Sequence, residues 1–131
     1  MASRFLNTIT IILCFSFITF SQTVTVKIIE TSDVHGAIFP YDLKDNKETS
    51  NSLARVTTFL KEQRTDTNQI VFLLDNGDIL QGDPVVYYYN FEKTDTIHLY
   101  ANVMNFMRYD AATIGTHDIE TGHDVYDKFN K

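Results

Sequence analysis

Cysteine, positive charge and long apolar segments are all scarce in this chain. One of its 131 residues is Cys, at position 14, so no intramolecular disulfide can form. Lys and Arg number 11 against 17 Asp and Glu, which gives a formal net charge of −6. A negative surface argues against non-specific binding to nucleic-acid backbones, so a nucleic-acid polymer is not an expected partner.

The amino terminus has the features of an exported protein. Arg4 supplies a positive charge before the apolar run 9–20, and Thr19 and Ser21 place small side chains at positions −3 and −1 of a cleavage site. An apolar run of about 12 residues is shorter than the roughly 20 needed to span a bilayer. We therefore expect residues 1–21 to be a secretory signal peptide rather than a retained membrane anchor. Its removal would take the one Cys with it and leave no thiolate chemistry.

The rest of the chain alternates between strand and helix patterns. Apolar runs typical of strands cover 24–29, 70–74 and 111–114. Between them apolar residues recur at helical spacing, first at Leu53, Val56, Phe59 and Leu60, then at Ile97, Tyr100, Val103, Met104 and Met107. Two polar stretches, around 42–52 and 61–68, are typical of loops. This β-α-β-α-β order predicts an α/β fold.

Three short polar segments follow the apolar runs and carry side chains that can bind a metal or move a proton. They are Asp33-Val-His35, Asp75-Asn-Gly-Asp78 and Gly115-Thr-His117-Asp118. In an open α/β sheet the active site lies at the carboxyl ends of the strands. We therefore expect the three segments to converge at one edge of the sheet.

The residue types in these segments favour a divalent metal ion. Alternation along an extended strand would point Asp33 and His35 to the same side. A carboxylate and an imidazole suit zinc, manganese or iron, and a carboxylate-rich site also admits magnesium or calcium. The two oxygens of Asp78 could bridge two ions roughly 3.5–4 Å apart. Gly77 beside it would allow backbone and ion to approach closely.

The order Asp-x-His, Gly-Asp, Gly-x-His-Asp/Glu resembles the calcineurin-like metallophosphoesterases. Three longer strings are similar to the secreted 5'-nucleotidase and 2',3'-cyclic-nucleotide 2'-phosphodiesterase group, namely Thr31-Ser-Asp-Val-His-Gly36, Leu74-Asp-Asn-Gly-Asp-Ile-Leu-Gln-Gly-Asp-Pro84 and Tyr109-Asp-Ala-Ala-Thr-Ile-Gly-Thr-His-Asp118. The resemblance covers residues 24–129 and implies part of a layered α-β-β-α fold. On this basis we expect residues 22–131 to be the amino-terminal portion of a phosphoesterase domain. Later ligand histidines and a substrate-binding domain would come from sequence beyond it.

The resemblance also implies a two-metal site. Asp33 and His35 would bind the first ion, and Asp78 would bridge the first and second ions. The ions would be divalent, such as zinc, manganese, magnesium or cobalt. Thr116 stands where the family has an Asn whose amide oxygen binds the second ion. A neutral hydroxyl on a shorter side chain is a poorer ligand, so a second ion is expected to be held less well here than in the family.

His117 is the catalytic histidine that the resemblance implies. In the family this histidine pairs with an Asp three residues later, and here that position holds Glu120. Glu120 can orient the imidazole and stabilise its protonated form.

The implied activity is metal-dependent hydrolysis of a nucleotide phosphomonoester or cyclic phosphodiester outside the cytoplasm, in the periplasm or the extracellular space. The partner is then a nucleotide or another phosphate ester. The negative net charge does not exclude it, because bound divalent ions would dominate the field at the phosphate.

Plainer interpretations stand beside these. Asp33 and Asp78 could cap loops without binding metal. His98 and His123, near the starts of helices, are expected to be solvated, and Tyr87-Tyr-Tyr89 is expected to pack between layers. The chain could also be a module that binds one ion and catalyses nothing, or an incomplete fragment that exposes one face of its sheet.

Overall fold

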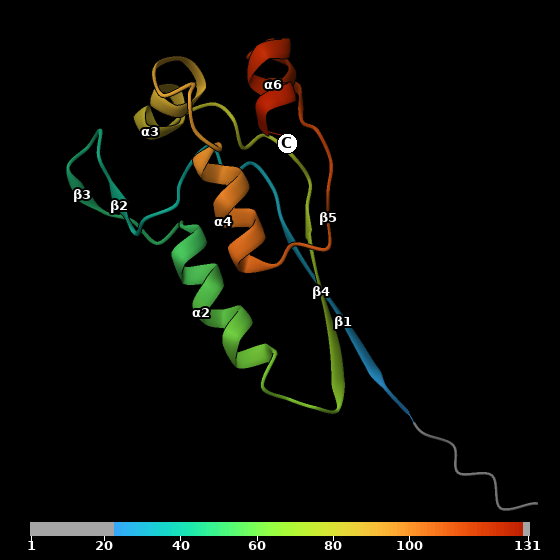
Figure 1. Ribbon diagram of the computed structural model, residues 1–131. Coiled ribbons are helices and arrows are strands. Elements are labelled where there is room, and N and C mark those ends of the chain that lie inside the picture. The colour runs from blue at the N-terminus through green and yellow to red at the C-terminus, as the bar shows by residue number, and fades with distance from the viewer. Residues whose placement is uncertain (1–22, 130–131) are drawn as a thin grey trace, which may run out of the picture.

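The computed structural model describes residues 23–129, and the expected α/β fold is confirmed (Figure 1). The elements in chain order are β1 (Thr25–Thr31), β2 (Tyr41–Asp42), β3 (Lys47–Glu48), α2 (Leu53–Gln63), β4 (Gln69–Asp75), α3 (Pro84–Tyr87), the π-helical turn η1 (Tyr88–Glu92), α4 (Leu99–Met107), β5 (Ala111–Ala112), α5 (Thr116–Glu120) and α6 (His123–Phe129). The predicted signal peptide lies outside the described residues. Within those residues, no helix has the length and apolar character needed to cross a membrane.

A parallel sheet in the order β1-β4-β5 forms the centre of the molecule. Thr31 at the end of β1 pairs with Asp75 at the end of β4, and Asp75 pairs with Ala112 at the end of β5. The three strands therefore finish level with one another. All three polar segments begin at this common edge.

Helices α2 and α4 cover one face of the sheet (Figure 1). Ser52 caps α2 by accepting a hydrogen bond from the Arg55 N–H, and Leu53 and Leu60, two helical turns apart, are both buried. These two leucines pack with Leu73 of β4 and Met107 of α4. This cluster fixes the sheet against its helices.

A second cluster lies under the carboxyl edge of the sheet. Its buried members come from the loop after β4 and from three helices, and they are Ile79, Leu80, Val86, Tyr100, Met104 and Val125. Ile79 and Leu80, the two residues after Asp78, are buried in this cluster and so fix the position of the loop that carries Asp78.

The opposite face of the sheet is open. Val26 and Ile28 of β1 and Ile70 and Phe72 of β4 are 41–66% exposed. Because alternate strand residues share a face, these four belong to the side away from α2. No element among residues 23–129 covers that side, and an apolar sheet face of this kind is normally buried against another layer.

The observed elements differ in detail from the sequence prediction. β1 continues two residues past the predicted run, because its backbone pairs with β4 regardless of polarity, and β5 is shorter than 111–114. The first predicted loop contains the small β2-β3 hairpin, and the second begins inside α2. Phe59 on α2 is exposed instead of buried, and Ile97, which the pattern placed on a helix, lies exposed before the start of α4.

The expectation that His98 is solvated is wrong, whereas His123 is exposed as expected. His98 is 0% exposed. Its Nδ1 accepts a hydrogen bond from the Tyr100 N–H at 3.3 Å, so Nε2 carries the proton and donates to Asn90 Oδ1 at 2.9 Å. Asn90 Nδ2 in turn donates to the Leu80 carbonyl at 2.8 Å. His98 thus ties α4, through Asn90, to the loop that carries Asp78.

In the Tyr87–Tyr89 segment only Tyr89 packs inward as expected: it is half-buried, and its ring lies 6.1 Å from that of the buried His98. Tyr87 is 60% exposed and Tyr88 is 49% exposed. The rings of these two tyrosines contact neighbours along the chain, Tyr87 with Phe91 and Tyr88 with Tyr89.

Burial of His98 predicts a pH-dependent stability. Burial lowers the pKa of His98 from its ordinary 6.5 to about 4. Between these values the unfolded chain binds a proton that the folded chain does not. The free energy of unfolding therefore has its full value well above pH 6.5 and falls as pH drops towards 4, by about 2 kcal/mol at pH 5.

Urea unfolding of the wild type at pH 8, 6 and 5 should show this fall in the free energy of unfolding, and His98→Gln should show a flatter profile. His123→Gln, which changes an exposed histidine, is the control and should keep the wild-type profile. Identical profiles for wild type and His98→Gln would contradict the assignment.

Candidate active site

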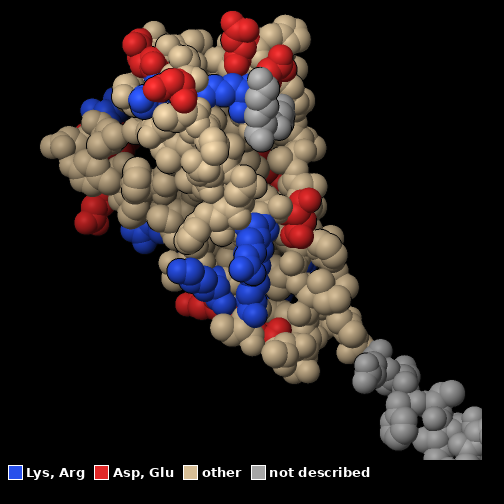
Figure 2. Space-filling model, in the orientation of Figure 1, with Lys and Arg blue, Asp and Glu red and all other residues tan. Residues whose placement is uncertain are grey.

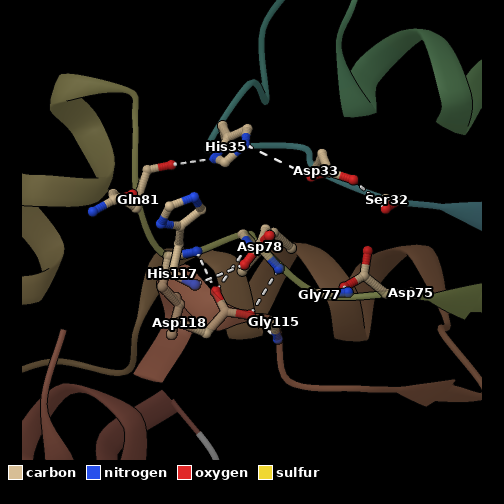
Figure 3. A network of polar contacts seen from close by, with 12 residues as sticks. Ser32, Asp33, His35, Asp75, Gly77, Asp78, Gln81, Gly115, His117 and Asp118 are labelled. Atoms are coloured by element: carbon tan, nitrogen blue, oxygen red, sulfur yellow. Dashed lines mark hydrogen bonds and ion pairs between the residues drawn. The ribbon is translucent and has the colours of Figure 1, made fainter. Parts of the chain in front are cut away.

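The loops that follow β1 and β4 lie beside each other (Figure 3) and are joined by backbone hydrogen bonds. The Asp33 N–H donates to the Gly77 carbonyl at 3.1 Å, and the His35 N–H donates to the Asp78 carbonyl at 2.9 Å. The sheet ladder therefore continues, in irregular form, past the ends of the strands. This pairing brings the first two polar segments side by side.

Three of the predicted metal ligands have a left-handed backbone. The φ angles are 52° at Asp33, 47° at His35 and 60° at Asp78. Residues other than Gly rarely adopt this region, and each such case costs free energy that the surrounding structure must supply. The prediction that a regular strand aims Asp33 and His35 together is therefore wrong in its geometry. β1 ends at Thr31, and a turn brings the two side chains together instead.

Two glycines allow the second and third segments to touch. A Cβ on Gly77 would lie 2.3 Å from the Gly115 nitrogen, and a Cβ on Gly115 would lie 2.1 Å from Asp78 Oδ1. Neither position has room for a side chain. Asp78 Oδ1 uses this proximity to accept a hydrogen bond from the His117 N–H at 2.8 Å.

His117 and Glu120 form the contact expected from the sequence. The Nδ1 atom of His117 lies 3.0 Å from Oε2 of Glu120 across one turn of α5. This hydrogen bond raises the pKa of the His117 imidazole above its ordinary value and lowers the pKa of the Glu120 carboxyl. Because the carboxylate of Glu120 accepts this hydrogen bond and so favours a proton on Nδ1, Nε2 is left facing away from Glu120 and available to a substrate.

The histidines of the first and third segments also meet. The rings of His35 and His117 have centroids 5.6 Å apart, and His35 Nε2 lies 3.9 Å from Asp33 Oδ1. His35 Nδ1 is 3.2 Å from the Gln81 carbonyl, which holds the ring in place. Thr116 is exposed at the first position of α5. All six predicted site residues thus lie on the loops and short helix at the carboxyl edge of the sheet.

Two buried carboxylates at this edge have roles that the sequence did not reveal. Asp75 accepts hydrogen bonds from Thr31 Oγ1 and from the Gly77 N–H, and burial raises the pKa of its carboxyl. Asp118 accepts four backbone N–H groups. Both residues belong to the polar segments identified in the sequence. The position of Asp118 could have indicated its role, because an acidic side chain at the third residue of a helix can accept a hydrogen bond from the N–H of the residue before the helix.

The donors suit a divalent ion in chemistry and in location, but they are an incomplete set. Two carboxylates and an imidazole are ligands of the type that zinc and manganese accept. Within residues 23–129, no three His, Cys, Asp or Glu side chains are grouped closely enough to hold an ion. Asp33, His35 and Asp78 would therefore hold a first ion only together with further donors, and any second ion needs donors in addition to Asp78 and Thr116.

Two hollows border residues of the candidate site, one at Glu120 and the other at Asp33. One, of about 390 Å³, is bounded by Gln81, Glu120 and the aromatic pair Tyr87 and Phe91. Another, of about 480 Å³, includes Asp33 among its walls. Figure 2 shows several acidic side chains near the top of one face of the molecule, a group of basic side chains near its lower middle, and wide uncharged areas between them.

The contact between His117 and Glu120 can be tested directly. Glu120→Gln removes the carboxylate that holds a proton on the ring, so the pKa of His117 should fall towards its ordinary 6.5. The measurement is an NMR titration of the imidazole signals. Glu62→Gln, which changes an exposed glutamate on α2, should leave the His117 titration unchanged. If both variants titrate like the wild type, Glu120 does not control the ring.

Comparison with known proteins gives relatives of one kind. The trifunctional nucleotide phosphoesterase protein YfkN of Bacillus subtilis is 36% identical over 111 residues, which are 79% of this chain and 8% of that protein. The 2',3'-cyclic-nucleotide 2'-phosphodiesterase/3'-nucleotidase of Yersinia enterocolitica is 31% identical over 111 residues, 82% of this chain and 17% of that protein. The chain thus spans less than a fifth of each of these two relatives. No family model matches it.

Solved structures agree with the sequence comparison. The crystal structure of the calcineurin-like phosphoesterase YfkN from Bacillus subtilis matches 81% of this chain and 34% of its own, with 32% identity and a TM-score of 0.70. A putative 5'-nucleotidase from Staphylococcus aureus matches 79% of this chain and 20% of its own, with 28% identity and a TM-score of 0.69.

Proposed function

We propose, for this calcineurin-like phosphoesterase chain, a part in the metal-dependent hydrolysis of nucleotide phosphate esters. The substrates would be nucleoside monophosphates or 2',3'-cyclic nucleotides, the classes named for its relatives. The observation that carries the proposal is the meeting of three separate polar segments at one edge of the sheet. Asp33, His35, Asp78 and His117 reach this edge on backbone that is strained or tightly packed.

Each of these residues has a defined task in the proposed reaction. Asp33, His35 and Asp78 would hold divalent ions, which supply a Lewis acid for the phosphate oxygens and make a bound water acidic. His117, kept protonated by Glu120, would donate a hydrogen bond to the phosphoryl oxygens or a proton to the leaving alkoxide. Since Asp78 Oδ1 also accepts the His117 N–H, the metal-binding carboxylate and the catalytic ring are set relative to each other.

The proposal includes the setting of the chain in a larger protein. Residues 22–131 would be the amino-terminal portion of a phosphoesterase domain, with a second layer packed on the open face of Val26, Ile28, Ile70 and Phe72. Further metal ligands and the nucleoside-binding region would come from that additional sequence. Export, with residues 1–21 as the signal peptide, would place the reaction in the periplasm or outside the cell.

Asp78→Asn in the intact protein tests the metal-binding role. An amide cannot bridge two cations with two negative oxygens, so kcat/KM for a 2',3'-cyclic nucleotide or a 5'-nucleotide should fall by at least about 100-fold. The measurement is phosphate release or loss of the cyclic ester under manganese. Asp42→Asn, at the end of β2 where the carboxylate accepts N–H groups of the hairpin loop, is the matched control and should retain activity. Activity of Asp78→Asn near that of the wild type would refute the bridging role.

Thr116→Asn separates full catalysis from the alternative of a module that holds one ion. An amide oxygen at this position would add a donor beside Asp78, so the intact protein should gain affinity for a second ion. Metal content measured by mass spectrometry after dialysis should rise from about one to about two per chain if the wild-type second site is weak. Thr113→Asn, on the same connection after β5, controls for the substitution itself. Turnover that rises with the second ion would identify Thr116 as the cause of low activity. If Thr116→Asn leaves metal content and turnover unchanged, Thr116 does not limit the site.

A further inference from the structure

Asp118 is the most heavily bonded side chain at the carboxyl edge of the sheet. It is 4% exposed, and its Oδ1 accepts the Ile79 N–H at 2.9 Å and the Leu80 N–H at 2.7 Å. Its Oδ2 accepts the Asp78 N–H at 2.8 Å and the Gly115 N–H at 2.9 Å. A carboxylate offers about four acceptor positions, so each of these is used.

The four donors come from two different segments. Three belong to the loop after β4 and the fourth belongs to the turn before α5, on which Asp118 itself lies. A buried carboxylate needs compensation, and no cationic side chain among residues 23–129 forms an ion pair with it. Hydrogen bonds from backbone N–H groups to an ionised acceptor supply that compensation.

A second carboxylate crosses the same junction in the opposite direction. Asp78, which lies on the loop that Asp118 holds, accepts the N–H of His117, the residue next to Asp118. The left-handed backbone of Asp78 and the close contact between Gly77 and Gly115 leave this loop little freedom. The two aspartates thus form a reciprocal pair of clamps between the metal-binding loop and the catalytic helix.

We propose that Asp118 is a positioning residue, which sets the Asp78 carboxylate for metal binding and locks it to the His117 backbone. It touches neither metal nor substrate. This inference rests on the proposed function because it takes a metal ion to bind at Asp78. The hydrogen bonds of Asp118 do not depend on that function. Figure 3 shows Asp118 below the Asp78 loop, on the side away from His35.

The decisive comparison uses two aspartates that both accept backbone N–H groups. In Asp118→Asn one oxygen is replaced by NH₂, which faces two N–H donors and cannot accept from them. Asp110→Asn is the matched control, because Asp110 Oδ2 accepts the Leu73 N–H at 2.8 Å on the sheet, away from the clamp. The experiment titrates the intact protein with Mn²⁺ and follows free ion by electron paramagnetic resonance, which needs no turnover.

We expect Asp118→Asn to weaken Mn²⁺ binding by roughly 10–100-fold, the range found for residues that orient a metal ligand through hydrogen bonds without touching the metal. Asp110→Asn should bind within about twofold of the wild type. Asp118→Glu keeps two negative oxygens and should recover part of the loss, which loss of general stability would not explain. Wild-type Mn²⁺ affinity in Asp118→Asn, or an equal loss in Asp110→Asn, would overturn the proposal.

The remaining outcomes are also decisive. If Asp118→Asn does not fold, Asp118→Glu is compared with Asp110→Asn, and a several-fold weaker Mn²⁺ affinity of Asp118→Glu alone supports the clamp. Equal affinities would refute it. Failure of the proposed function has a different signature: the wild type would bind Mn²⁺ and lose it on Asp118→Asn, yet hydrolyse no nucleotide ester.

Discussion

The level ends of three parallel strands are the constraint on which the rest of this structure depends. Pairing of Thr31 with Asp75, and of Asp75 with Ala112, brings the chain out of the sheet three times at the same height. Each exit carries one polar segment. A shift of the β4 register by two residues would keep every apolar side chain on its own face and yet separate Asp33 from Asp78 by roughly two strand rises, about 7 Å. The geometry of the candidate site is therefore a consequence of strand register.

Beyond the strand ends, backbone groups do most of the positioning. The loops after β1 and β4 bond to each other through Asp33, His35, Gly77 and Asp78, and the third segment is attached by Asp118. Such an arrangement leaves the side chains of Asp33, His35 and His117 pointing to the exposed side of the junction, where a phosphate ester could reach them. Rigid support with exposed reactive groups is what proximity and electrostatic stabilisation require of a catalytic site.

Much of this arrangement could be predicted from the sequence, because apolar runs followed by polar segments mark strand ends. The helices also followed from spacing, since Leu53 and Leu60 are buried where the pattern places them. The conformation of Asp33 and His35 could not be predicted, because left-handed backbone at non-glycine residues leaves no sequence pattern. Asp118 was missed because its loop donors are 38 to 40 residues away and are backbone groups, which every residue has. His98 was missed for the same kind of reason, because its burial depends on Asn90, which only the tertiary fold brings close.

Anomalous diffraction from crystals of the intact protein grown with Mn²⁺ tests the central claim most directly. The account predicts a manganese peak bounded by Asp33, His35 and Asp78. It also predicts that His117 lies beside the ion without coordinating it through Nδ1, which Glu120 occupies. A protein that hydrolyses nucleotide esters with manganese bound elsewhere, and with none at the junction of the three segments, would contradict it.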